Sequence, residues 1–419
     1  MFIINIKQLV GIRENPKIWS EATSRTLSGL RGSELGILPC LDDAYVQIEG
    51  DTIVDYGSMK DFTQNTEGVL YDAEGQFVLP AWCDSHTHIV YAGSREHEFE
   101  DKIKGISYEE IARKGGGILN SAQKLNETSE EDLFAQAWTR LEAVKKLGTG
   151  AIEIKSGYGL TVEGELKMLR VIKRLKTASN MTIKATFLAA HTYPTAFKNN
   201  HQGYIRQIIE DMLPRVAEEN LADYIDVFCE EGFFSMAETE QILEAGLKYG
   251  LKPKIHANQL HLSGGVQVGV KHNAVSVDHL ECMSDVEIEC LKNSNTIATL
   301  LPTAAFFLRM PYQPARKLID ANLVVALATD YNPGSSPSGN VPFLLSLSCI
   351  QMKMTPEEAI NAVTLNGAYA MEVDNELGSI TIGKKANLIV TKKMPSLSYL
   401  PYSFGENLID KVMIKGVFQ

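Results

Sequence analysis

The segment Asp84-Ser85-His86-Thr87-His88 follows an apolar run, Gln76–Cys83, that is typical of a buried β-strand. His86 and His88 stand two residues apart, so both imidazoles leave the same face of an extended segment. Two imidazoles on one face can bind one metal ion, and a third imidazole with a carboxylate would complete a hydrolytic site that keeps room for water. If the segment is part of such a site, later strands should end in a further histidine and a carboxylate.

Further strand-like runs follow this segment and alternate with stretches long enough for helices. They are Ala151–Ser156, Thr182–Ala190, Tyr224–Cys229, Lys252–Ala257, Ala274–His279, Thr296–Leu301 and Asn322–Thr329. Leu133–Leu147 and Glu163–Thr177, which lie between them, have helical spacing. Eight β/α units over roughly 300 residues predict an α/β fold, a (β/α)8 barrel of the TIM type. A doubly wound parallel sheet is the alternative, but no GxGxxG motif follows the first strand.

The two ends of the chain have a different pattern. Tyr45–Val54 alternates apolar and polar residues around Gly50-Asp51, as a β-hairpin does, and short strand-like runs return in Gly378–Val390. Strands from both ends can pair with one another. The sequence thus predicts a small β-sandwich domain made of residues 1–76 and 377–419, with the barrel, residues 77–376, inserted between its halves.

The composition excludes several classes of protein. Hydrophobic residues make up 44% and charged residues 22%, which is ordinary for a soluble globular chain. The net charge of -12 argues against a nucleic-acid partner. No apolar run approaches the ~20 residues of a membrane span, and the N-terminus lacks a signal-peptide pattern. The six cysteines form no CxxC pair, which disfavours a thiolate metal site. We expect a cytoplasmic protein.

Ionisable or phenolic side chains mark most of the expected strand ends. In order along the chain they are His86 and His88, Tyr158, His191, Glu230 and Glu231, His256, His279 and Asp330. Because a barrel of this type carries its catalytic residues at the carboxyl ends of its strands, we expect these side chains to meet. This placement is hard to explain by structural needs alone.

The strongest prediction is one zinc or iron ion held by His86, His88, His256 and Asp330, since neutral imidazoles and a carboxylate suit both metals. A bound ion lowers the pKa of its water and makes hydroxide available near neutral pH. Asp330 can ligate the ion and also accept the water proton. The alternative for Asp330 is a turn or helix-capping residue.

Other strand-end residues have expected roles with open alternatives. We expect His279 to hydrogen-bond the water or a developing oxyanion, because four ligands already fill the site; a fourth imidazole ligand and a packed core histidine are the alternatives. His191 and Tyr158 are expected to contact substrate, with a structural role as the alternative for each. Arg95 suits a substrate carboxylate, against a surface salt bridge with Glu96 or Glu98.

Two features have weaker interpretations. Lys155 lies near a strand end and is compatible with a carbamylated lysine that bridges two metal ions, a minor alternative to the single-ion site. Gly115-Gly116-Gly117 is either a flexible loop or a mobile lid over the site.

These motifs together resemble the amidohydrolase superfamily, through Leu79–His88, the later His, His and Asp, and the closing Gly378–Val390. Within it the chain is similar to a branch that acts in histidine degradation. The motifs that carry this closer likeness are Ser107–Ile111, Gly115–Ile118, Glu153–Leu160, Ala189–Pro194, Phe228–Gly232 and Ala328–Ser335. They span nearly the whole chain and are more specific than two spaced histidines.

The resemblance implies hydrolysis of the cyclic amide 4-imidazolone-5-propanoate to N-formimidoyl-L-glutamate, with metal-bound hydroxide attacking the ring carbonyl. It implies one zinc or iron ion on the four ligands above, a small-molecule substrate and a homodimer. By matching positions it also implies a set of binding residues. Arg95, Tyr158, His191 and Ser335 would contact the substrate, Tyr108 would lie nearby, and Asn332 and Gly334 would contact the glutamate end of the product.

One position departs from that family pattern. Members often carry Glu three residues after the strand-five histidine, whereas this chain has Gln259. An amide can hydrogen-bond but cannot act as a general base near neutral pH. Either Gln259 only positions substrate, or proton transfer belongs to Asp330 and His279. Gln259 also argues against a purine or pyrimidine deaminase. Another cyclic amidase and a barrel that has lost catalysis are the remaining alternatives.

Overall fold

The structure is a computed structural model that describes residues 1–13, 29–63, 68–106 and 116–419. The predictions for Tyr108 and for Gly115 of the glycine cluster lie outside the described residues. In the part of the chain that is described, no helix has both the length and the apolar character needed to cross a membrane.

Eight parallel strands form one of the two eight-stranded sheets of the described residues, and their order in space follows their order in sequence. They are β6 (Trp82–Thr87), β7 (Thr149–Lys155), β8 (Thr182–Ala190), β9 (Tyr224–Cys229), β10 (Lys252–Ala257), β11 (Ser276–His279), β12 (Ile297–Leu300) and β13 (Val325–Leu327). Two hydrogen bonds join the first strand to the segment after the last: His88 N to Tyr331 O at 2.9 Å and Asp330 N to His86 O at 3.0 Å. The sheet is therefore a closed barrel, and the predicted fold class is confirmed.

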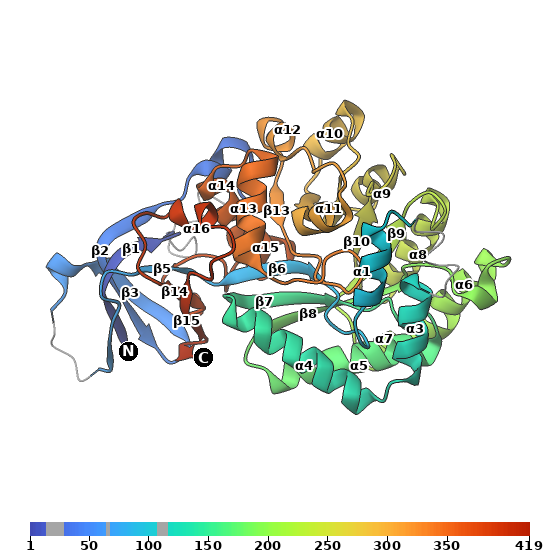
Figure 1. The fold of residues 1–419 in the computed structure, drawn as a ribbon, viewed down its shortest axis with the longest axis horizontal. Coiled ribbons are helices and arrows are strands. Elements are labelled where there is room, and N and C mark those ends of the chain that lie inside the picture. Colours follow the sequence, from blue (N-terminus) through green and yellow to red (C-terminus); the bar gives the residue numbers. More distant parts are fainter. Residues whose placement is uncertain (14–28, 64–67, 107–115) are drawn as a thin grey trace.

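Helices surround the barrel (Figure 1). The predicted helical stretches are α4 (Glu130–Lys146) and α5 (Val162–Ala178). Ser129 caps α4 through a bond from Asp132 N, and acidic residues in its first turn with lysines in its last match the helix dipole. The other helices are α1 (Glu96–Ile103), α3 (Gly117–Glu127), α6 (His201–Arg206), α7 (Leu213–Glu218), α8 (Met236–Lys248), α9 (Gly265–Lys271), α10 (Asp285–Lys292), α11 (Pro302–Leu308), α12 (Ala315–Asp320), α13 (Val341–Met352), α14 (Pro356–Val363), α15 (Leu365–Ala370) and α16 (Tyr399–Tyr402).

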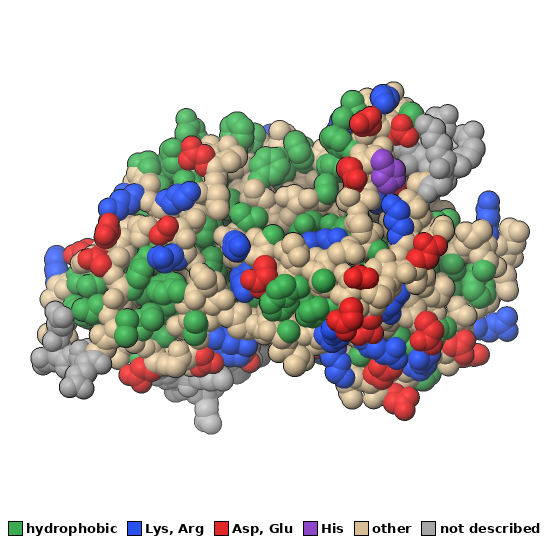
Figure 2. All heavy atoms as spheres, turned by 60° about the horizontal axis from the view of Figure 1, so that its bottom comes forward, with side chains coloured by type: hydrophobic (Ala, Val, Ile, Leu, Met, Phe, Trp, Pro, Cys, Tyr) green, Lys and Arg blue, Asp and Glu red, His purple; other side chains and the backbone are tan. Residues whose placement is uncertain are grey.

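The outer helices carry mixed charge. Figure 2 shows acidic and basic side chains interspersed on the face where α4 and α5 lie. Part of this pattern is ion pairing between these two helices, since Arg174 of α5 pairs with Glu130 at 3.1 Å and with Glu131 at 2.9 Å. Such exposed pairs are worth little individually, so the barrel core supplies most of the packing energy.

The second sheet joins the two chain ends, which lie side by side in Figure 1. Its strands are β1 (Phe2–Val10), β2 (Cys40–Glu49), β3 (Thr52–Ser58), β4 (Leu70–Asp72), β5 (Phe77–Pro80), β14 (Leu388–Thr391), β15 (Ile409–Ile414) and β16 (Val417–Phe418). The predicted hairpin around Gly50 is β2–β3. Bonds from Ile53 N to Lys384 O and from Ala386 N to Asp51 O bring this hairpin onto the C-terminal segment. Residues from both ends share one apolar core.

The predicted first barrel strand, Gln76–Cys83, is divided between the two sheets. Phe77–Pro80 is β5, which pairs with β1 and β14, and the barrel strand begins only at Trp82. Ala81 N donates to Asn387 O in the small sheet, whereas Trp82 N donates to Gly148 O in the barrel. The segment is buried in both sheets, so no polar residue marks the point at Ala81 where the chain passes from one sheet to the other. β5 thus lies beyond residue 76, the predicted edge of the small domain.

Candidate metal centre and active site

The four predicted ligands meet at one end of the barrel. His86 lies within β6 and His88 directly after it, His256 lies in β10, and Asp330 follows β13. The Nε2 atom of His88 is 3.3 Å from Nε2 of His86 and 3.4 Å from Oδ1 of Asp330. The Nε2 atom of His86 is 3.5 Å from the same oxygen. Imidazole and carboxylate donors thus converge on one small volume.

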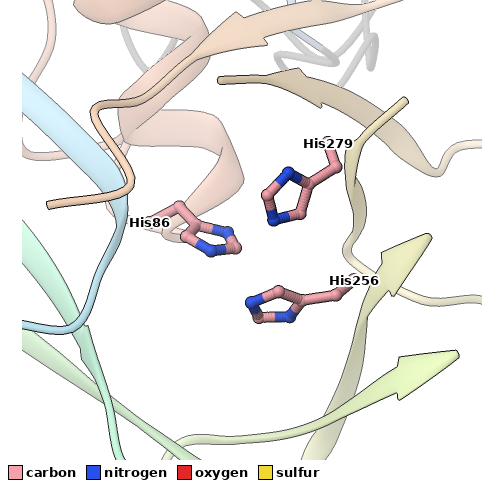
Figure 3. A group of neighbouring side chains, drawn as sticks. All are labelled: His86, His256 and His279. Atoms are coloured by element: carbon pink, nitrogen blue, oxygen red, sulfur yellow. The ribbon is translucent and has the colours of Figure 1, made fainter. Parts of the chain in front are cut away.

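His279, the last residue of β11, belongs to the same cluster. Its ring points toward those of His86 and His256 (Figure 3). Two sets have donor atoms within 4.8 Å of one another, His86 with His88 and Asp330, and His86 with His256 and His279. All five residues are buried. The geometry places His279 near enough both for ligation and for contact with a molecule bound at the centre.

The donors fit a divalent cation. Nδ1 of His86 is 2.6 Å from Oδ2 of Asp278, and Nδ1 of His256 is 3.0 Å from Oδ2 of Asp226. An imidazole that donates Nδ1–H to a carboxylate presents the lone pair of Nε2 on its other side. Nε2 of His256 is buried without a hydrogen-bond partner among the described residues. Nitrogen lone pairs that converge in this way are stabilised by a shared proton or a cation.

The environment also sets suitable protonation states. Burial lowers the pKa of His256 to about 4, and burial together with the charge of Lys155 holds the pKa of His86 well below its usual value. Neutral imidazole is the form that binds metal. Burial alone raises the pKa of Asp330, but the hydrogen bond to His88 and the charge of His279 outweigh it, so the pKa lies below its usual range.

His279 differs from the other imidazoles. Burial lowers its pKa, but the carboxylates of Glu281, with Oε1 at 3.4 Å from Nδ1, Asp330 and Asp278 together outweigh burial, so the pKa of His279 lies above its ordinary value. A higher pKa favours the protonated form, in which an imidazole donates hydrogen bonds.

His279 and Asp330 also have positive φ angles of 85° and 52°. Such backbone conformations cost about 1–3 kcal/mol each and concentrate at functional sites.

A cavity of about 420 Å³ opens over the cluster. Its lining combines apolar residues with hydrogen-bonding groups. The apolar residues are Ile118, Phe228, Phe233, Leu260, Leu308 and Met310, and the polar ones beyond the cluster are Arg95, Tyr158, His191, Gln259, Asn332 and Ser335, with Gly334 beside them. The predicted substrate-binding residues within the described part of the chain therefore all line one cavity.

Arg95 precedes α1 and is held by a buried partner. Its Nε and Nη2 atoms donate to Oε2 of Glu98 at 2.9 and 2.6 Å. Both side chains are nearly inaccessible, so this pair is an interior one and not the surface salt bridge considered from the sequence. Nη1 faces Gly334, where an added Cβ would lie 2.4 Å from it. Arg95 therefore lines the cavity while its other edge is fixed.

The turn after β13 lines the cavity beside Arg95. Oδ1 of Asn332 accepts bonds from the backbone N–H groups of Gly334 and Ser335, both at 2.8 Å. The hydroxyl of Ser335 donates to Oδ2 of Asp330 at 3.0 Å. Asn332 thus fixes the turn and Ser335 orients the carboxylate. Asn332 and Ser335 therefore both line the cavity and stabilise the geometry of the site.

Tyr158 and His191 lie beside His88. Tyr158 is buried after β7, and the ring of His191 stacks on that of His88 with centroids 5.5 Å apart. Nδ1 of His191 is 3.2 Å from the carbonyl oxygen of Gly157. Burial, then the neighbouring His88, holds the pKa of His191 well below its usual value. A neutral His191 that donates Nδ1–H to this carbonyl keeps Nε2 as a hydrogen-bond acceptor.

Several supporting residues were missed by reasoning from the sequence. Asp226 holds the imidazole of His256 from behind, and Asp278 holds that of His86. A charged residue inside a buried strand was the available signal, because such charges need partners. Glu230 directly follows β9, as expected, and accepts a bond from Leu260 N at 2.8 Å, so it fixes the loop that carries Gln259. Its neighbour in sequence, Glu231, is exposed.

A parallel barrel with imidazoles and a carboxylate at its strand ends defines a class of metal-dependent hydrolases. The Amidohydrolase family matches residues 77–418, and the chain belongs to that family. It is 56% identical over 414 residues to an imidazolonepropionase of Flavobacterium johnsoniae, covering 99% of this chain and 98% of the relative. It is 54% identical to one of Christiangramia forsetii, covering 99% of both. The chain is a member of the imidazolonepropionase family.

Two solved structures with this fold are more distant in sequence. A zinc-bound adenosine deaminase of Xanthomonas campestris superimposes with a TM-score of 0.71 at 15% identity, covering all of this chain and 92% of the other. A guanine deaminase of E. coli gives 0.71 at 13% identity, covering all of this chain and 99% of the other. At this identity the likeness concerns the fold alone.

Proposed function

We propose that this chain hydrolyses 4-imidazolone-5-propanoate to N-formimidoyl-L-glutamate in histidine degradation, with a zinc or iron ion on His86, His88, His256 and Asp330. The observation that carries the proposal is the full-length identity of 54–56% to imidazolonepropionases. The cavity agrees with it, because Arg95 faces the same space as the ligand cluster. A ring that bears a carboxylate would thus meet both a cation and the ligand cluster in one cavity.

A divalent ion at these residues supplies Lewis acidity that lowers the pKa of water. Asp330 then accepts the proton of the attacking water, with Ser335 holding Oδ2 of its carboxylate. His279 donates a hydrogen bond to the ring carbonyl oxygen as that oxygen gains negative charge. When the ring C–N bond breaks, the proton held by Asp330 passes to the leaving nitrogen, and the former carbonyl carbon becomes the new carboxylate.

The remaining polar residues bind and orient the substrate. Arg95 pairs with the propanoate carboxylate through the edge that Glu98 leaves toward the cavity. Tyr158 and His191 hydrogen-bond the ring beside His88. Gln259 contributes an amide that positions the ring, so proton transfer rests with Asp330 and His279.

The test is the decay of the ultraviolet absorbance of freshly generated 4-imidazolone-5-propanoate, with and without the purified, metal-loaded protein. We expect faster decay, formation of N-formimidoyl-L-glutamate, and loss of the acceleration after the metal is chelated. Reloading with zinc or ferrous iron in parallel identifies the better metal. No acceleration by protein that is shown to contain metal would mean that the chain acts on another ring.

A further inference from the structure

A group of charged side chains fills the barrel interior behind the imidazoles. It consists of Glu153 and Lys155 of β7, Asp226 of β9, Lys254 of β10 and Asp278 of β11, and none of these side chains is exposed. Nζ of Lys155 lies 2.7 Å from Oε1 of Glu153, 2.8 Å from Oδ2 of Asp226 and 3.6 Å from Oδ2 of Asp278. One ammonium group therefore faces three carboxylates from three strands.

Two of these carboxylates also hold imidazoles of the ligand cluster. Oδ2 of Asp278 lies 2.6 Å from Nδ1 of His86, and Oδ2 of Asp226 lies 3.0 Å from Nδ1 of His256. These are the same oxygens that face Lys155. His86 in β6 is thus connected to this cation through one oxygen of Asp278, and His256 in β10 through the carboxylate of Asp226, whose Oδ1 also lies 3.1 Å from Nδ1 of His256.

Buried carboxylates are costly unless a cation compensates them. Apart from the imidazoles, Lys155 is the cationic side chain of the described residues that lies within 4 Å of both Asp226 and Asp278. We propose that Lys155 is a positioning residue for the metal centre: its ammonium fixes Asp226 and Asp278, and they aim Nε2 of His256 and His86 at one point. The inference rests on the metal ion of the proposed function. It also replaces the carbamylated-lysine alternative, since an anionic carbamate would face three carboxylates.

Lys254 is a matched control. It is the same residue type, is equally buried, and forms its ion pair with Glu153. Its ammonium also lies 4.8 Å from the centroid of the Tyr224 ring. Loss of Lys254 thus removes one buried positive charge from the same network without removing the contact to Asp226 or Asp278.

The experiment measures metal binding, not turnover. Zn²⁺ affinity is determined by competition with a chelator, and the visible absorption of Co²⁺-loaded protein reports the ligand geometry. We expect Lys155→Met to weaken Zn²⁺ binding about 10- to 100-fold, the usual cost of losing support behind a ligand, and to change the Co²⁺ spectrum. Lys254→Met should leave both close to those of the unmodified protein.

Equal behaviour of the two methionine variants would overturn the inference, because it would reduce the role of Lys155 to that of any buried charge. Failure of the unmodified protein to bind either metal would instead overturn the proposed metal centre itself. If circular dichroism shows that Lys155→Met does not fold, Lys155→Arg takes its place. Arginine keeps the charge, but its planar group cannot occupy the same point, so weaker binding and a changed spectrum are expected, and unchanged values would contradict the proposal.

Discussion

The cavity has two sides that are built differently. In the metal wall, which we define as His86, His88, His256, His279 and Asp330, every residue except Asp330 lies on a strand or directly after one, Asp330 follows β13 by three residues, and all but His86 line the cavity. The loop wall, defined as Arg95, Gln259, Asn332, Gly334 and Ser335, lies on connecting segments. Carboxylates inside the barrel hold His86 and His256. In the loop wall, Glu98 holds Arg95 and Glu230 holds the backbone beside Gln259.

This difference separates two properties of the site. Strand-built ligands keep one geometry because the barrel fixes their spacing, whereas loops can change without moving the strands. The metal wall should therefore determine whether chemistry occurs, and the loop wall which ring is accepted. Each substitution in these two walls tests that separation.

Loss of a residue of the metal wall should have the largest effect. We expect His256→Ala to abolish metal binding and to lower turnover by at least about 10³-fold, because water activation is lost with the ion. Metal content and turnover of the same preparation measure both. His201→Ala, which removes a half-exposed histidine elsewhere, is the control. Undiminished turnover in the His256 variant would refute the ligand assignment.

In the loop wall, removal of Arg95 should mainly weaken binding. Loss of charged hydrogen bonds worth about 2 kcal/mol corresponds to a KM roughly 30-fold higher, with kcat changed much less. Steady-state kinetics separate the two constants. Because Arg95→Ala also leaves Glu98 without its cation, Arg95→Lys is measured beside it. A fall in kcat with an unchanged KM in both variants would show that the two walls are not separable in this way.

Gln259 should have a smaller effect. If its amide only positions the ring, Gln259→Ala raises KM by less than about tenfold, well short of the roughly 10²–10⁴ that general acid–base groups contribute to kcat. The pH profile of kcat should keep its shape, since no titrating group is removed. A profile that loses one limb would place Gln259 in the proton path, contrary to the proposal.

Prediction from sequence succeeded where a pattern repeats. Eight strand runs with helices between them predicted the barrel, and alternation at both ends predicted the small sheet. The crossing at Ala81 was missed because the chain stays apolar while it changes sheets. Contacts behind the ligands, such as Lys155 with Asp226, depend on strands brought together by barrel closure, 71 residues apart. The spacing of residues within one strand does not predict which residues of the other strands will face them inside the barrel.

The smallest predicted effect concerns stability. Asp84 accepts bonds from the backbone and hydroxyl of Thr329 at 3.0 and 2.6 Å, but burial raises its pKa to about 7 from an ordinary value of 3.8. The folded state thus holds a proton that the unfolded chain releases. This contribution to stability is full below about pH 4 and is lost as the pH rises through about 7.

Asp84→Asn should remove that dependence, since an amide does not titrate. Relative to the unmodified protein, the variant should gain about 2–4 °C in Tm between about pH 5 and pH 8. Metal-free protein is used for both, because metal binding itself depends on pH. Parallel curves for the two proteins would show that Asp84 does not titrate in this range.

The closure of the barrel has a consequence for how the protein is made. Asp330 meets His86 and His88 only where the last strand returns to the first, so this carboxylate leaves the ribosome long after those two histidines. A metal ion bound here would link the first strand of the barrel to the segment after the last strand. The ion would bind the closed barrel of the complete chain more tightly than any partly synthesised chain, and by mass action it would stabilise the closed barrel.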